Sequence, residues 1–125
     1  MKRKVYYHHT DCGKVVYYAN YLHFLEEART EFLQDRGIDI LDLMQKGKFF
    51  VVARQQIDYH APARYGDILE ITTKLICCKG VRIELEHTIK KEQIIIAEAK
   101  TTLAFVDSQF KLKPLPEDLV RKLQQ

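Results

Sequence analysis

The stretch HTDCGKVVYYANYLHFLEEARTE, residues His9–Glu31, decides how this chain folds. It starts with a turn sequence around Asp11, continues through an apolar bridge and enters a strongly amphipathic helix. Asn20 is suited to cap the start of this helix, which we expect to run to Arg36, where Gly37 ends it. This is the only sizeable helix that the pattern predicts in a chain of 125 residues.

After the helix, apolar and polar side chains alternate with a period of two, which is typical of strands. A short second helix or turn is expected first, over residues 38–46. Long strands are predicted at Phe49–Tyr59, Ile68–Cys78, Val81–Lys90 and Ile94–Val106, with another strand before the helix at Lys4–His9 and a short helix after Asp107. Successive strands with short connections form an antiparallel meander.

The apolar face of such a sheet must be covered, and the helix at Tyr21–Arg36 is the available cover. We therefore predict an α+β fold in one domain, residues 1–125, with a long central helix wrapped by an antiparallel sheet of about five strands. One helix does not protect both sheet edges, so we expect a dimer joined edge to edge. The predicted contact residues are Tyr21, Leu22, Leu25, Ala28, Phe32 and Leu33 on the helix and Ile95, Ala97 and Ala99 on the last strand.

Composition and charge exclude several classes of protein. The 20 basic and 17 acidic residues give a net charge of +3, without the basic stripe of a nucleic-acid-binding protein. The longest aliphatic run, Ile94–Ala97, is far too short for a membrane span, and the first residues lack the apolar segment of a signal peptide. Three cysteines, two of them adjacent, argue against a disulfide framework and favour a cytoplasmic location. The five histidines have no metal-ligand spacing, and we expect neither a metal nor a cofactor.

Asp11 is the first candidate for chemistry. Beside a helix start, an ionised carboxylate can activate water or attack a carbonyl carbon. The same spacing also fits an aspartate that only caps its own turn, which is common in T-D-x-G sequences. The backbone N–H groups of Tyr18 and Ala19 are the second candidate, because the first amides of a helix lack internal partners and can bind a thioester or ester oxygen.

Other polar residues offer weaker candidates. Cys12 adjoins Asp11, but a thiolate nucleophile needs a lowered pKa and a base. Glu26 is an acid or base only if it faces a pocket. The chain has one serine, Ser108, and no G-x-S-x-G motif, which strongly disfavours serine hydrolase chemistry. Cations near strand ends that can bind phosphate groups or simply aid solubility are Arg54, Arg64, Lys79 and Arg82.

Two motifs resemble a known family. The segments YYHHTDCGKVVYYANYLHFLEEARTEFL, from Tyr6, and FVVARQQIDYHAPARYGDILEI, from Phe50, are similar to the hydroxybenzoyl-CoA thioesterase family and its YbgC-type, Tol-Pal-associated acyl-CoA thioesterase branch. The similarity covers nearly the whole chain. The combination of an aspartate turn, a V-x-Y-x-N-Y bridge and an E-x-A-R-x-E helix is specific.

The resemblance implies a hotdog fold, a homodimer or homotetramer, and hydrolysis of an acyl-CoA thioester to the free acid and CoA. It implies that Asp11 is the catalytic carboxylate and that the Tyr18 amide polarises the thioester carbonyl. It also implies a site at the dimer interface, with CoA phosphates on surface cations. We therefore count Asn20, Glu26, Arg64, Lys79 and Arg82 as candidate substrate-binding residues.

The chain departs from the YbgC-type branch at two positions. Tyr18 stands where that branch usually has histidine, so this position is expected to act through its backbone. His9 stands where the family often has an acidic residue, which changes the charge around Asp11. A non-catalytic module that binds acyl-CoA or an acyl-carrier protein is the alternative function. Another hotdog reaction, such as hydration, is disfavoured because its histidine motif is missing.

Overall fold

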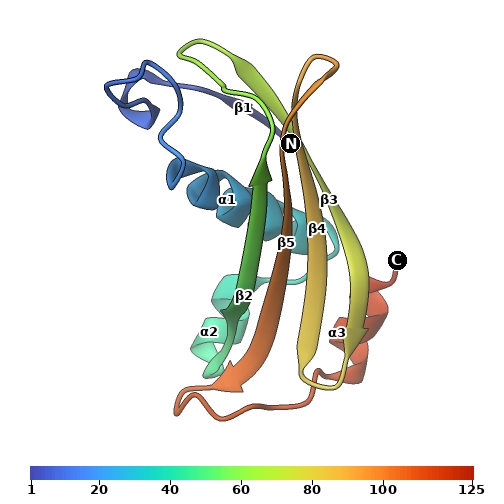
Figure 1. Ribbon diagram of the computed structural model, residues 1–125. Coiled ribbons are helices and arrows are strands. Elements are labelled where there is room, and N and C mark those ends of the chain that lie inside the picture. Colours follow the sequence, from blue (N-terminus) through green and yellow to red (C-terminus); the bar gives the residue numbers. More distant parts are fainter.

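The computed structural model describes residues 1–125. Its elements are β1 (Lys2–Lys4), a 3-10 turn (Tyr7–His9), α1 (Asn20–Asp35), α2 (Ile40–Gln45), β2 (Lys48–Tyr59), β3 (Ile68–Lys79), β4 (Arg82–Lys91), β5 (Ile94–Asp107) and α3 (Glu117–Leu123). The predicted α+β class is confirmed: five antiparallel strands form one curled sheet, and α1 packs across its concave side (Figure 1). No helix is long and apolar enough to cross a membrane.

The strand order in the sheet is β1-β3-β4-β5-β2. The predicted meander therefore holds for β3, β4 and β5 only. The first long strand, β2, lies beside β5 and not beside β3, because the loop at residues 60–67 carries the chain across to the other side of the sheet. This crossover leaves all twelve residues of β2 at one edge of the sheet.

Three register shifts help the sheet curl around the helix. They fall in β2 between Val52 and Arg54, in β3 between Leu75 and Cys77, and in the β4–β5 pair after Ile89. An extra residue in one strand bends it and increases its twist. The third shift also corrects a prediction, because Ile96 is buried in the core while Ile95 is exposed.

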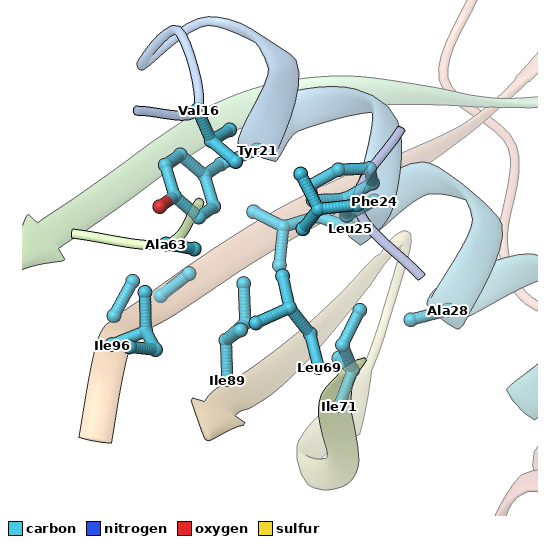
Figure 2. Packing of buried hydrophobic residues seen from close by; sticks show 13 residues of the cluster. Val16, Tyr21, Phe24, Leu25, Ala28, Ala63, Leu69, Ile71, Ile89 and Ile96 are labelled. Atoms are coloured by element: carbon cyan, nitrogen blue, oxygen red, sulfur yellow. The ribbon is translucent and has the colours of Figure 1, made fainter. Parts of the chain in front are cut away.

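The core beneath the first half of α1 is built from α1, β3, β4 and β5 (Figure 2). The predicted small residues Ala97 and Ala99 are both buried there, so the helix approaches the sheet closely. Leu22, predicted in the contact face, is instead exposed, and Phe24 is fully buried in its place. A second cluster, which includes Phe32, Leu33 and Phe105, fills the space towards α2 and α3.

The N-terminal segment differs most from the prediction. A strand was expected at Lys4–His9, but β1 ends at Lys4 and the chain turns at Tyr7–His9. The ring nitrogen Nδ1 of His9 accepts a hydrogen bond from the Tyr6 amide at 2.8 Å, and the His9 amide donates to the Tyr6 carbonyl at 3.0 Å. These local hydrogen bonds replace the hydrogen bonds of a strand, and the resulting turn directs the chain towards the start of α1.

Candidate active site

Asp11 lies at the tip of a short loop that a β-bridge between Thr10 and Val16 closes. The Asp11 amide donates to the Val15 carbonyl at 3.1 Å. One carboxylate oxygen, Oδ1, accepts a hydrogen bond from the Gly13 amide at 2.8 Å, so the expected turn-capping bond is present. The other oxygen, Oδ2, accepts no hydrogen bond from the protein, and the side chain is exposed. The carboxylate is therefore held at one oxygen and free at the other.

The start of α1 provides two free donors beside this loop. The amides of Tyr18 and Ala19 donate no hydrogen bond within the chain, whereas the amides on either side do. The prediction of Asn20 as the N-cap is wrong, because Ala19 occupies that position, without a side-chain cap. No side chain caps this helix start, so the two amides remain free donors at the positive end of the helix dipole.

Asn20 instead ties the loop to the helix. Its side-chain amide donates to the His9 carbonyl at 2.8 Å, and the same carbonyl accepts from the Tyr17 amide at 2.9 Å. The loop that carries Asp11 leaves directly from His9. Asn20 therefore has a positioning role in the structure, between the carboxylate and the free amides.

Tyr18 is anchored by its backbone, while its ring is exposed. Its carbonyl accepts a hydrogen bond from the hydroxyl of Tyr59 on β2, at 3.1 Å. Burial raises the pKa of Tyr59, so this hydroxyl stays protonated and donates at neutral pH. With Val16, Tyr21 and residues 60–62, the two tyrosines line a depression of about 330 Å³.

His9 is buried beneath the loop, with its ring centroid 4.9 Å from that of Phe24. Burial lowers its pKa below 6.5, with further lowering by His8 and Arg3. The imidazole is therefore neutral at pH 7 and adds no full charge near Asp11. Cys12 is exposed and has no hydrogen-bond or ion-pair partner. No group of three or more His, Cys, Asp and Glu side chains is arranged to hold a metal ion.

The remaining predicted residues are dispersed. Arg64 lies in the loop at residues 60–67, which meets the site where the Val16 amide donates to the Ala63 carbonyl at 2.8 Å. Glu26 lies further along α1, at a separate cavity beside α2. Lys79 and Arg82 face each other across the β3–β4 turn, at the end of the sheet away from the Asp11 loop (Figure 1). Within one chain, the structure does not bring these two cations to Asp11.

Sequence reasoning missed two residues that the structure brings forward. Tyr59 is predicted only as the last residue of a strand, yet its hydroxyl donates a hydrogen bond to the carbonyl of Tyr18. Arg29 was not singled out, although it belongs to the E-x-A-R-x-E motif and lines the cavity beside α2. The sequence did contain a signal for Arg29, because an arginine that lies between two buried helix residues, Ala28 and Phe32, is placed beside the core.

Comparison with known proteins shows which family this chain belongs to. The family model of the thioesterase-like superfamily matches residues 5–123. The acyl-CoA thioester hydrolase YbgC of Escherichia coli O6:H1 is 37% identical over 125 residues, covering 98% of this chain and 92% of that protein. Hypothetical protein TT1821 from Thermus thermophilus superposes with a TM-score of 0.94 at 29% identity, over 99% of this chain and 95% of that one.

A further solved structure, the gentisyl-coenzyme A thioesterase BH1999, superposes with a TM-score of 0.92 at 26% identity. The match covers 97% of this chain and 98% of that one. The family that the motifs indicated is thus confirmed over nearly the whole length. The chain belongs to the thioesterase-like superfamily, has its hotdog fold and is a thioester hydrolase.

Proposed function

We propose that this protein hydrolyses an acyl-CoA thioester to the free acid and CoA, with Asp11 as the working carboxylate. The observation that carries the proposal is the pair of free amides at Tyr18 and Ala19 beside a carboxylate with one free oxygen. The YbgC relative, which is named as an acyl-CoA thioester hydrolase, supports the same substrate class.

The oxyanion donor in this mechanism is the Tyr18 amide. The thioester carbonyl oxygen accepts its hydrogen bond, and the helix dipole stabilises the negative charge that develops there. Loss of one such donor typically costs about 100- to 1000-fold in rate. Tyr18 has no imidazole, so its side chain does not replace the histidine that is usual at this position in the YbgC-type branch. The hydrogen bond from the Tyr59 hydroxyl to the Tyr18 carbonyl holds the backbone of Tyr18 in place.

Asp11 acts by one of two routes. As a general base it takes a proton from water while the oxygen attacks the carbonyl carbon; the C–S bond then breaks and CoA leaves as a thiolate. As a nucleophile it forms an anhydride by expelling the thiolate, and water then hydrolyses the anhydride. In both routes one water is consumed, and CoA leaves without needing a strong acid.

The second part of the proposal is a homo-oligomer built on a dimer. The edge strand β2 leaves the N–H and C=O groups of its outer side unpaired along its twelve residues. Apolar side chains are also exposed there, namely Val52 on β2 and Leu41 and Met44 on the adjacent α2. An unprotected edge of this length favours pairing with a second copy. The partner's Lys79 and Arg82 are then candidates for CoA phosphates, together with Arg64. A monomer mass in sedimentation velocity at micromolar concentration contradicts this part.

The decisive experiment is a thiol-release assay over a panel of acyl-CoAs with Asp11→Asn. Asparagine keeps an oxygen that accepts from the Gly13 amide, so the loop is preserved while the carboxylate is lost. We expect hydrolysis to fall by about 100-fold or more. Unchanged turnover in this variant refutes the assignment. Tight CoA binding without turnover of any acyl group by the unmodified protein supports the alternative, a binding module. In labelled water, single-turnover incorporation of label into Asp11 distinguishes the nucleophilic route.

A further inference from the structure

A cavity of about 150 Å³ is lined by residues of α1, α2 and the start of β2 and by none of the Asp11 loop. Figure 1 shows where these three elements lie in the fold. Its walls are mostly apolar, and its volume corresponds to about five water molecules in the liquid. The lining residues from α1 are Glu26, Arg29, Thr30 and Leu33, and those from α2 and β2 include Met44, Lys48, Phe49 and Phe50. Such a cavity fits a short aliphatic or other apolar group.

Arg29 is the unusual residue in this wall. It is half-buried, and its guanidinium group makes no hydrogen bond and no ion pair within the chain. Burial lowers the pKa of Arg29, and the nearby Glu26 offsets this only in part. The fully buried side-chain nitrogens without a partner belong to Arg36 and His87 and not to Arg29, so part of the Arg29 guanidinium stays open to water. An anion that entered the cavity would therefore meet a cation that no protein acceptor occupies.

The other charges at the cavity do not supply that anion. Glu26 is exposed, and the only hydrogen bond its carboxylate makes is from the Thr30 hydroxyl at 3.4 Å. Lys48 is half-buried and adds a second cation without an ion-pair partner. The lining thus carries two unpaired cations and one carboxylate in an otherwise largely apolar wall. This combination matches an anionic group attached to a hydrocarbon chain.

We propose that this cavity binds a carboxylate on a short aliphatic chain, with Arg29 as its principal ligand and Lys48 as a second cation. The planar guanidinium donates two parallel hydrogen bonds to a carboxylate, which a lysine does not reproduce. The chain packs against the aromatic rings of Phe49 and Phe50. This inference rests on the proposed function, because thioester hydrolysis releases a carboxylic acid and so provides a biological source for the ligand.

Two sources share this chemistry. One is the free acid, which is the reaction product, and its binding then acts as feedback on the enzyme. The other is the distal carboxylate of an acyl-CoA derived from a dicarboxylic acid. They are distinguished by comparing inhibition by hexanoate with the ratio of kcat/KM for adipoyl-CoA over hexanoyl-CoA. If the free acid is the source, Arg29→Met relieves the inhibition. If the source is the bound substrate, the variant lowers the ratio.

The binding test uses the full-length protein carrying Asp11→Asn, so that no turnover is needed. Hexanoate and the uncharged alcohol of the same chain length, hexanol, are titrated by calorimetry against this protein and against versions that also carry Arg29→Met or Arg36→Met. Arg36 is a matched control, because it directly follows the last residue of the same helix but stacks over the Phe32 ring at 3.5 Å, outside the cavity. We expect hexanol and the Arg29→Met protein each to show about tenfold weaker binding, with Arg36→Met unchanged.

Equal binding of hexanoate and hexanol, or no loss in Arg29→Met, overturns the proposal. So does a change in oligomer mass with Arg29→Met when hexanoate binding is unaltered, because the missing carboxylate then belongs to a second copy of the chain. Melting temperatures show whether each variant folds. Because binding is measured without catalysis, this proposal and the role of Asp11 succeed or fail separately.

Discussion

Replacing His87 with leucine is predicted to remove about 2 kcal/mol of the stability that this protein loses between pH 7 and pH 5. His87 lies on β4 facing α1, is completely buried, and pairs through Nδ1 with the Thr73 hydroxyl at 3.0 Å. Its other ring nitrogen, Nε2, has no partner. Burial, with a smaller effect of the Arg29 charge, lowers its pKa from 6.5 to about 4.

The sign and size of the effect follow from proton binding. In the unfolded chain this imidazole is protonated below pH 6.5, whereas in the folded protein it stays neutral until about pH 4. The unfolded state therefore binds more protons across this window, and the free energy of unfolding falls as the pH is lowered. The difference of about 2.5 pKa units corresponds to roughly 3 kcal/mol at pH 4 and below, of which about 2 kcal/mol is lost by pH 5.

The measurement is urea denaturation at pH 7 and pH 5, at one protein concentration, for the wild type, His87→Leu and Thr73→Val. We expect the leucine variant to lose about 2 kcal/mol less than the wild type over this range. Thr73→Val removes the hydrogen bond but keeps the buried imidazole, so it lowers stability at both values while preserving the pH dependence. His9, whose lowered pKa acts in the same direction, is present in all three proteins. Equal losses for the wild type and His87→Leu refute the reasoning.

Two further substitutions test the geometry of the candidate site. In Gly13→Ala the new Cβ meets Asp11 Oδ1 at 3.2 Å, so the carboxylate must move by a few tenths of an ångström. We expect kcat/KM to fall by about tenfold with stability changed by less than about 1 kcal/mol, as a thermal melt beside the thiol-release assay will show. Tyr59→Phe deletes the bond to the Tyr18 carbonyl while keeping the ring. We expect a two- to fivefold fall in kcat/KM, from a bond worth about 0.5–1 kcal/mol, and an unchanged rate shows that the bond does not position the amide.

The regular elements were predictable because their patterns are long. The α1 helix was expected from Asn20 to Arg36 and runs to Asp35, and the long strands were placed within one or two residues. On β4, His87 falls in the same alternation as Ile83, Leu85 and Ile89 and is buried with them. What failed was the strand order, because an eight-residue loop after β2 is compatible with either a return beside the same strand or a crossover. Pattern alone does not choose between them.

The wrong predictions at the N-terminal strand and at the helix cap had a different cause. In both places a side chain forms a hydrogen bond with a backbone group. The segment Tyr6–His9 is rich in residues that favour strands, yet the His9 ring accepts the Tyr6 amide and the chain turns. Asn20 is a residue type typical of an N-cap, yet its side-chain amide donates a hydrogen bond to the carbonyl of His9, eleven residues earlier. Such bonds depend on where the chain has been placed by the rest of the fold.

The hydrogen bond of Asn20 links the local folding of the chain to the geometry of the candidate site. A side chain at the N-cap stabilises a helix by about 1 kcal/mol, because it accepts from an amide two or three residues further on, which for Asn20 would be that of Leu22 or His23. Here the side chain at the helix start is drawn to the His9 carbonyl, and the amides of Tyr18 and Ala19 stay free. The same bond holds the base of the loop that carries Asp11. Asn20 therefore fixes the loop of Asp11 beside the helix start instead of capping the helix, so donors and carboxylate are positioned together before any substrate binds.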